Sequence, residues 1–200
     1  MSKLLLATNN QGKVKEIQAL LSDLPIELVT PDSLGVELQV DEHGQTYAEN
    51  AALKAVAFAK VTGLITLADD SGLEVDALDG LPGLHSARFS SRPGATDADR
   101  RAYLLQRLQG QARPWTARFR CVIALAAADQ PLQFAEGICE GEIIPQERGL
   151  NGFGYDPIFL FPALGKTLAV LSMAEKNQLS HRARAVMAAR PLLAGIVLKY

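Results

Sequence analysis

Short apolar runs alternate along this chain with longer segments of helical periodicity, and this alternation constrains the fold more than any other feature. Residues 4–7 form a continuous apolar run typical of a buried strand, and residues 26–29 predict a second strand. The alanine-rich segment 46–61 predicts a helix, with Thr46 as its N-cap and Glu49 at the capping-box position. Strands that alternate with helices favour the α/β class.

The middle of the chain argues against a purely parallel sheet. Two long runs, 119–128 and 132–144, predict the strands of a hairpin around Asp129, Gln130 and Pro131. Because hairpin strands are antiparallel, we expect a mixed sheet flanked by helices.

Two further helices are expected in the second half of the chain. One should open at Thr96 or Asp97, where a capping residue precedes a segment of helical periodicity. The other should cover residues 180–198, with Pro191 breaking it into two pieces because proline removes a helical hydrogen bond.

The size and charge of the chain limit its classes of function. With 200 residues it is long enough for one sizeable core, so we expect a single domain over residues 1–200. The net charge of -2 predicts no nucleic-acid partner. The first apolar run is too short for a signal peptide or a membrane span, and Cys121 and Cys139 lack the spacing of a zinc site. We therefore expect a cytoplasmic protein with free thiols and no membrane contact.

The segment 65–75 places two adjacent carboxylates, Asp69 and Asp70, directly after an apolar run and before Ser71 and Gly72. Mg²⁺ prefers oxygen ligands, so a strand that stops here resembles a metal-binding strand end. The same four residues are common turn formers, so a plain β-turn is an equally good interpretation. Adjacent side chains of a strand point to opposite faces, so the two carboxylates would share a target only if the strand had already turned.

Two further segments suit an anionic ligand. Residues 8–13 lie where a strand gives way to a helix, so their backbone N–H groups and lysine favour a phosphate, with an ordinary turn as the alternative. The pattern does not match a Walker A loop. Asn50 and Lys54 share one helix face, where Lys54 would either pair with an anion or extend into solvent. Upstream, Asp41 and Glu42 add two carboxylates that suit a metal site.

The last two polar segments suit a flat, polar ligand. The stretch 149–157 combines glycines with aromatic residues, and a ring such as Phe153 can stack on a nucleobase, with core aromatics as the alternative. The segment 175–182 predicts a helix start with Ser180 as N-cap, and a solvated helix start is its alternative interpretation. Its possible donors are Lys176, His181 and Arg182.

Five motifs occur in the order and spacing of the inosine/xanthosine triphosphate pyrophosphatases, so the chain resembles that family from position 8 to position 182. The motifs are Thr8-x-Asn10-x-x-Lys13, Glu49-Asn50-Ala51, Ala68-Asp69-Asp70-Ser71-Gly72-Leu73, Phe153-Gly154-Tyr155-Asp156-Pro157 and Ser180-His181-Arg182. The resemblance implies an elongated mixed sheet in two lobes with a central nucleotide cleft, and a homodimer. It also implies a Mg²⁺-dependent hydrolase that converts ITP, dITP and XTP to the nucleoside monophosphate and pyrophosphate, which removes them from the nucleotide pool.

The resemblance also implies roles for individual residues. Asp70 would be the catalytic base and a metal ligand, Asp69 would support it, and Glu42 or Asp41 would be the second ligand of Mg²⁺. Phe153 would stack on the purine, and polar residues around it would read the purine edge. The residues expected to bind substrate are Thr8, Asn9, Asn10, Gln11, Gly12, Lys13, Lys54, Ser71, Phe153, Gly154, Tyr155, Asp156, Lys176, His181 and Arg182.

Two other functions stay open. A nucleotide-binding regulatory module without turnover would keep the same pocket, although paired carboxylates hinder a polyanion unless a metal intervenes. A pyrophosphatase of modified pyrimidine nucleotides is the other alternative. The sequence assigns no role to His85, Arg88 or Arg92.

Overall fold

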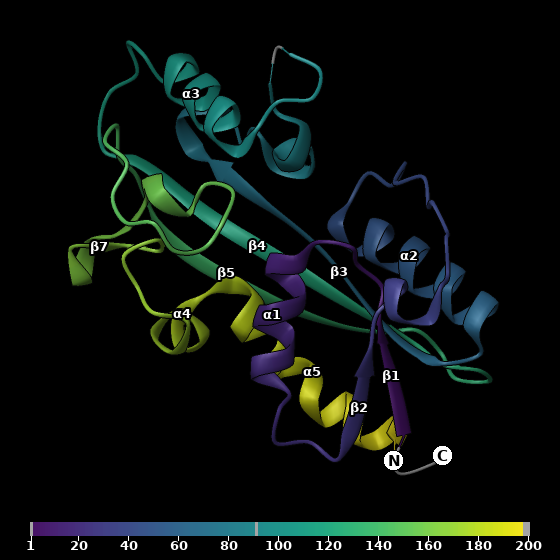
Figure 1. The fold of residues 1–200 in the computed structure, drawn as a ribbon. Helices are drawn as coiled ribbons and strands as arrows, with labels where there is room; N and C mark the ends of the chain where they lie inside the picture. The colour runs from purple at the N-terminus through teal and green to yellow at the C-terminus, as the bar shows by residue number, and fades with distance from the viewer. Residues whose placement is uncertain (1, 91, 198–200) are drawn as a thin grey trace. The chain divides into compact units, whose positions relative to one another are not determined.

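The computed structural model describes residues 2–90 and 92–197 (Figure 1). Within these residues, a seven-stranded sheet has the strand order β2-β1-β3-β4-β5-β6-β7. The strands are β1 (Ser2–Leu6), β2 (Ile26–Val29), β3 (Ile65–Val75), β4 (Trp115–Ala126), β5 (Gln133–Ile143), β6 (Phe159–Phe161) and β7 (Lys166–Thr167).

The sheet is mixed, as the sequence predicts. Strand β1 pairs in parallel with both β2 and β3, whereas β6 pairs antiparallel with β5 and with β7. Strands β4 and β5 are neighbours joined by the short connection 127–132, which only an antiparallel hairpin allows. The predicted α/β class and the predicted central hairpin are therefore confirmed.

Local sequence chemistry explains where the helices begin. Thr46 and Glu49 form the predicted capping box of one helix, and Thr96 and Asp99 form a capping box on another. The α-helices are α1 (Gln11–Leu20), α2 (Tyr47–Thr62), α3 (Asp97–Arg107), α4 (Met173–Leu179) and α5 (His181–Val197). The 3₁₀ helices are η1 (Asp32–Leu34), η2 (Asp76–Leu78), η3 (Gly83–Arg88), η4 (Asp156–Ile158) and η5 (Pro162–Leu164). Among the described residues, no helix combines the length and the apolar character needed to cross a membrane.

The chain forms two compact units, each built from separate stretches of sequence. The first unit contains Met1–Asp70, Cys121–Gly137 and His181–Tyr200, and the second contains Ser71–Arg120 and Ile138–Ser180. The expectation of one domain over residues 1–200 stays a prediction.

The alternation of side chains along β3 organises the first unit. Leu67 belongs to a buried cluster with residues of α1 and α5, whereas Ala68 belongs to a separate cluster with residues of α2. Side chains two positions apart on a strand share a face. Asp69 therefore lies on the face covered by α1 and α5, and Asp70 lies on the face covered by α2.

The second unit has one core, to which β3, β4, β5 and α3 contribute. Leu73 and Val75 of β3 pack there in one cluster with Leu104 and Leu108, at the C-terminal end of α3. Because these two β3 side chains are buried, the strand does not stop at Asp69 and Asp70 but continues to Val75. The predicted strand end is wrong, and so is the alternative of a plain β-turn.

One expectation about the last helices is also wrong, and the other is confirmed in part. Helix α5 passes through Pro191 without a break. The buried Ala189 and Leu193 lie on either side of that proline, and their packing holds the helix together despite the lost hydrogen bond. Helix α5 begins at His181, directly after the extended residue Ser180, so the predicted helix start is confirmed. Lys176, however, lies inside the preceding helix α4, whose C-cap is also Ser180.

Candidate functional site

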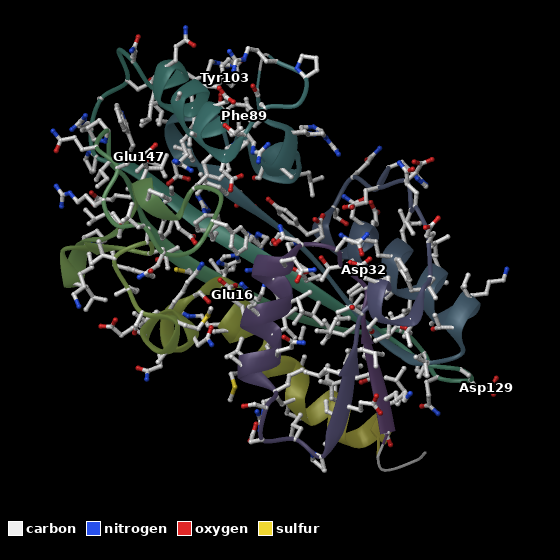
Figure 2. All side chains as sticks on the ribbon, in the orientation of Figure 1. Glu16, Asp32, Phe89, Tyr103, Asp129 and Glu147 are labelled. Atoms are coloured by element: carbon white, nitrogen blue, oxygen red, sulfur yellow. The ribbon has the colours of Figure 1, made fainter. Side chains whose placement is uncertain are left out.

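Asp69 lies in a buried network of charges within the first unit. Lys13 Nζ lies 3.0 Å from Asp69 Oδ2, and Arg182 Nη2 lies 3.3 Å from the same oxygen. Arg182 Nη1 also contacts Glu16 Oε2 at 2.5 Å, and Glu16 projects from α1 (Figure 2). Asp69, Glu16 and Arg182 are at most 2% exposed, so these two carboxylates pair with the guanidinium away from water, whereas the side chain of Lys13 keeps 15% exposure.

The charge state of Asp69 follows from these neighbours. Burial acts to raise the pKa of this carboxyl, but Lys13 and Arg182 outweigh it and hold the pKa well below its usual range. Cys121 Sγ lies 3.8 Å from Asp69 Oδ2, and burial raises the pKa of this thiol to about 12. Asp69 is thus ionised at neutral pH. Cys121 is a free thiol, as the sequence predicts, and its burial and raised pKa make it unreactive.

Asp70 has a different environment, on the α2 side of β3. Asn50 Nδ2 donates a hydrogen bond of 3.2 Å to Asp70 Oδ2, and Lys54 Nζ lies 4.0 Å from Asp70 Oδ1. Burial raises the pKa of Asp70, although Lys54 and Lys13 oppose the shift. The two neighbouring carboxyl groups therefore differ in chemistry, since Asp70 is the better proton acceptor.

Lys54 brings a second carboxylate close to Asp70. Lys54 Nζ contacts Glu42 Oε2 at 3.1 Å, and its side chain is only 13% exposed, so Lys54 pairs with anions and does not extend into solvent. The carboxylates of Asp70 and Glu42 thus both face the same group, the ammonium of Lys54. Asp41, the neighbour of Glu42, uses its main-chain oxygen to accept the N–H of His43 at 3.2 Å.

The oxygen ligands around Lys54 suit a hard cation. Among the described residues, no group of three or more histidine, cysteine, aspartate or glutamate side chains is arranged to hold a metal ion. A pair of carboxylates is nevertheless the number that Mg²⁺ commonly takes from a protein, because water and phosphate oxygens complete its shell. Asp70 and Glu42 fit this pattern of ligands.

The connection from β1 to α1 lies beside these groups in the first unit. The N–H of Ala7 donates to the carbonyl oxygen of Leu67 at 2.8 Å, which joins the end of β1 to β3 two residues before Asp69. Asn10 is the N-cap of α1, and its Oδ1 accepts the N–H of Lys13 at 3.1 Å. The connection therefore places a helix N-terminus and a lysine next to the aspartates, which suits an anionic ligand.

The second unit holds the predicted aromatic and polar residues of the glycine-rich loop (residues 149–157). Asp156 Oδ2 accepts the N–H of Phe153 at 2.9 Å and contacts Lys176 Nζ at 2.5 Å. The same Nζ lies 5.0 Å from the centre of the Phe153 ring, a cation–π distance. A side chain at Gly152 would place its Cβ 2.0 Å from Asp156 Oδ2, so this position requires glycine.

Two other residues of the predicted site, Tyr155 and His181, are buried. Tyr155 is buried, and its hydroxyl donates to the carbonyl oxygen of Ser86 at 2.9 Å. His181 is buried in the first turn of α5, where a Cβ on Gly137 would lie 2.2 Å from the His181 carbonyl oxygen. Among the residues without an assigned role, Arg88 Nε lies 3.2 Å from His85 Nδ1, and Arg92 Nη2 contacts Asp99 Oδ1 at 2.7 Å.

Three residues in these networks were missed by the sequence reasoning. Glu16 follows Lys13 by three residues, so helical spacing placed both on one face of α1. Asp97 and Arg101 are four residues apart on α3 and contact both polar main-chain groups of Gly154. The helical spacing of both pairs was visible in the sequence. The residues that they contact, Arg182 and Gly154, lie far away in the sequence, so the contacts themselves were not.

Comparison with known proteins identifies close relatives of this chain. A model of the Ham1 family matches residues 4–192. A Desulforamulus reducens protein named dITP/XTP pyrophosphatase is 48% identical over 192 residues, which cover 96% of this chain and 95% of that protein. A Gloeobacter violaceus protein of the same name is 49% identical over 197 residues, covering 98% and 94%. The solved structure of a HAM1 protein from Coxiella burnetii matches with a TM-score of 0.87 and 41% identity, covering 98% of this chain and 100% of that one.

Proposed function

Because the chain belongs to the Ham1 family, we propose that it hydrolyses deaminated purine nucleoside triphosphates such as XTP, ITP and dITP. The products are the nucleoside monophosphate and pyrophosphate, so the reaction removes these nucleotides from the pool. Both relatives named above are dITP/XTP pyrophosphatases, which supports this substrate class. In this chain, the observation that carries the proposal is the division between an ion-paired Asp69 and an Asp70 of raised pKa beside Lys54.

The first unit supplies the groups for the triphosphate. Lys13 and Lys54 are cations with part of their surface exposed, and the N-terminus of α1 adds backbone N–H groups. In our proposal Asp69 positions Lys13 and does not touch the phosphates. The other phosphate contacts of this unit are assigned to Thr8, Asn9, Asn10, Gln11 and Gly12. Ser71, which follows Asp70 and belongs to the second unit, is also assigned to the triphosphate.

Asp70 is the proposed general base. A base must accept a proton near the working pH, and burial raises the pKa of Asp70 towards that range. Asn50 holds one carboxylate oxygen, which leaves Oδ1 facing Lys54. Asp70 would take a proton from the attacking water, and Lys54 would balance the charge that develops on phosphate oxygens.

Asp70 and Glu42 are the proposed ligands of Mg²⁺, and the two carboxylates that meet at Lys54 support this assignment. Bound Mg²⁺ would supply positive charge to phosphate oxygens as pyrophosphate leaves. Asp41 is the less suitable second ligand, since Glu42 and not Asp41 reaches Lys54 with its carboxylate.

The second unit supplies the groups for the base. Phe153 would stack on the purine, and Lys176 would donate towards the C6 oxygen that distinguishes hypoxanthine and xanthine from adenine. Asp156 holds both of these residues, while Gly154 and Tyr155 shape the glycine-rich loop. We assign His181, the first residue of α5 and a member of the first unit, to the base as well. For Arg182, the contacts with Asp69 and Glu16 favour a supporting role over the base-reading role that the resemblance implies.

A panel of nucleotides tests the proposed function directly. The protein is incubated with Mg²⁺ and ITP, XTP, dITP, ATP, GTP, dTTP or UTP, and pyrophosphate and orthophosphate are measured separately. We expect pyrophosphate from ITP, XTP and dITP in clear excess over the other substrates. Release of orthophosphate, or equal rates with ATP and GTP, would contradict the proposal.

The same panel decides between the remaining alternatives. Preferred release from dTTP or UTP would indicate a pyrimidine nucleotide pyrophosphatase. Tight binding of ITP without turnover at any Mg²⁺ concentration would indicate a regulatory module. The homodimer, the cytoplasmic location and the nucleotide cleft stay predictions, and light scattering in solution measures the first of them.

A further inference from the structure

Helix α3 holds both polar main-chain groups of one residue in the glycine-rich loop. The N–H of Gly154 donates to Asp97 Oδ2 at 2.8 Å, and Arg101 Nη1 donates to the carbonyl oxygen of Gly154 at 2.8 Å. Asp97 and Arg101 are one helical turn apart on α3, so their side chains, the two arms of the helix, project from the same face. Gly154 has a φ of +60°, a conformation that a residue with a side chain rarely adopts.

These contacts determine how the chain leaves Phe153. The N–H of Gly154 belongs to the peptide group that follows Phe153, and the N–H of Phe153 belongs to the group that precedes it. Asp97 accepts the first and Asp156 accepts the second at 2.9 Å. Both peptide groups that flank Phe153 therefore donate a hydrogen bond to a carboxylate. The ring can then move mainly by rotation about the bonds of its own side chain.

The two arms on α3 are themselves held in place. Arg101 makes two bonds with Glu147, with Nε–Oε1 at 2.8 Å and Nη2–Oε2 at 3.0 Å, and Figure 2 labels Glu147. Arg100 pairs with Asp97 from the same helix. A planar guanidinium with two parallel bonds has little freedom, so Arg101 can fix the position of the Gly154 carbonyl.

We propose that Asp97 and Arg101 are positioning residues that present the Phe153 ring to the purine base. The inference rests on the proposed base-binding role of Phe153. Neither residue touches the base; each acts through the main chain of Gly154. Loss of either arm lets the glycine-rich loop sample other conformations, and substrate then binds only to the fraction that presents the ring.

Steady-state kinetics with ITP test the effect on substrate binding. We expect Asp97→Ala and Arg101→Met to raise KM about tenfold while kcat stays within about twofold, because base contacts stabilise substrate and transition state alike. Asp97→Asn keeps an oxygen that can accept the Gly154 N–H, so it should recover most of the wild-type KM. Arg107→Met is the matched control, since Arg107 lies on the same helix and contacts Tyr103 of that helix.

Binding of the two products, IMP and pyrophosphate, separates an effect on the base-binding residues from an effect on the phosphate-binding residues. Calorimetric titration should show about tenfold weaker binding of IMP to Asp97→Ala than to wild type, with pyrophosphate binding unchanged. Equal weakening of IMP and pyrophosphate, or a wild-type KM in both Asp97→Ala and Arg101→Met, would overturn the inference.

Amide hydrogen exchange tests the clamp, by which we mean the hydrogen bonds of Asp97 and Arg101 to the main chain of Gly154. This measurement does not depend on turnover. In Asp97→Ala the amide of Gly154 should exchange at least about tenfold faster than in wild type, while the Phe153 amide keeps its protection from Asp156. Unchanged exchange at Gly154 overturns the inference. If wild type releases no pyrophosphate from ITP, the proposed function fails, and the exchange measurement still decides whether the clamp exists.

Discussion

Asp69 and Asp70 are consecutive residues of β3, yet their carboxylates contact different helices. Asp69 pairs with Lys13 of α1 and Arg182 of α5, whereas Asp70 meets Asn50 and Lys54 of α2. The two-residue period of a strand makes this separation unavoidable once β3 continues past the pair. It gives one carboxylate permanent counter-ions and the other a raised pKa, and this difference leads to separate predictions for the two residues.

Asp70→Asn should remove activity without loss of stability. We expect kcat for pyrophosphate release from ITP to fall by at least about 100-fold, the range expected for a missing general base. Because burial raises the pKa of Asp70, its charge is unfavourable in the folded state, so the melting temperature should stay equal or rise. Asp129→Asn is the control, because Asp129 is exposed and its φ of 55° suits asparagine. Retained activity in Asp70→Asn would remove Asp70 from the catalytic role.

Asp69→Asn should mainly reduce stability. The substitution leaves Lys13 and Arg182 with one carboxylate fewer in a buried place, so we expect the free energy of unfolding to fall by about 3 kcal/mol. Urea denaturation measures this loss, with Asp129→Asn again as the control. A loss no larger than that of the control would show that the buried network contributes little.

Wild type and Asp69→Asn should also differ in how their free energy of unfolding depends on pH. The pKa of Asp69 is lower in the folded state than the ordinary value of 3.8, so its stabilising effect is fully present above that value. As the pH falls through the lower folded pKa, the effect is lost. The difference in unfolding free energy between wild type and Asp69→Asn should therefore be constant at neutral pH and shrink in acid. A difference that grows in acid would contradict the assigned charge state.

Chelation and two matched variants test the metal ligands. EDTA should stop pyrophosphate release, and added Mg²⁺ should restore it. We expect Glu42→Gln to raise the Mg²⁺ concentration for half-maximal rate about tenfold, because a carboxylate ligand is lost. Asp41→Asn should stay close to wild type, since in the structure Asp41 contacts His43 and not Lys54. If the two variants exchange these effects, Asp41 is the second ligand.

Phe153→Leu tests the stacking residue. Loss of the ring should raise KM for ITP about tenfold, in line with the usual energy of base–aromatic stacking. Phe134→Leu makes the same change at a half-exposed ring of β5 and should leave KM unchanged. Equal KM values for the two variants would show that Phe153 does not bind the base.

Local patterns in the sequence predicted most of the fold. The capping residues Thr46 and Thr96 marked two helix starts, because a hydroxyl that accepts a main-chain N–H acts within one turn. The end of β3 was predicted wrongly, since Asp, Ser and Gly favour turns locally but the burial of Leu73 and Val75 prevails. Pro191 was misjudged for the same reason, because tertiary packing outweighed a local penalty.

The predicted site residues are tied together by pairs that span long stretches of chain. Arg182 meets Asp69 and Glu16, and Lys176 meets Asp156, through folding that no local spacing reveals. Sequence motifs therefore singled out Arg182, and its ion pairs with Asp69 and Glu16 support the different role that we propose for it. The clamp on Gly154 was invisible for a related reason, since its acceptor and donor are main-chain atoms.

The discontinuity of the first unit has a consequence during translation. Its last segment, which begins at His181, carries α5 and the arginine that neutralises Asp69. A nascent chain that lacks this segment has the two aspartates of β3 and Lys13, but it lacks one of the two helices on the Asp69 face and one of the two cations that pair with Asp69. The first unit can therefore close only after the segment that begins at His181 has left the ribosome, so a shorter nascent chain carries Asp69 and Asp70 without a complete first unit.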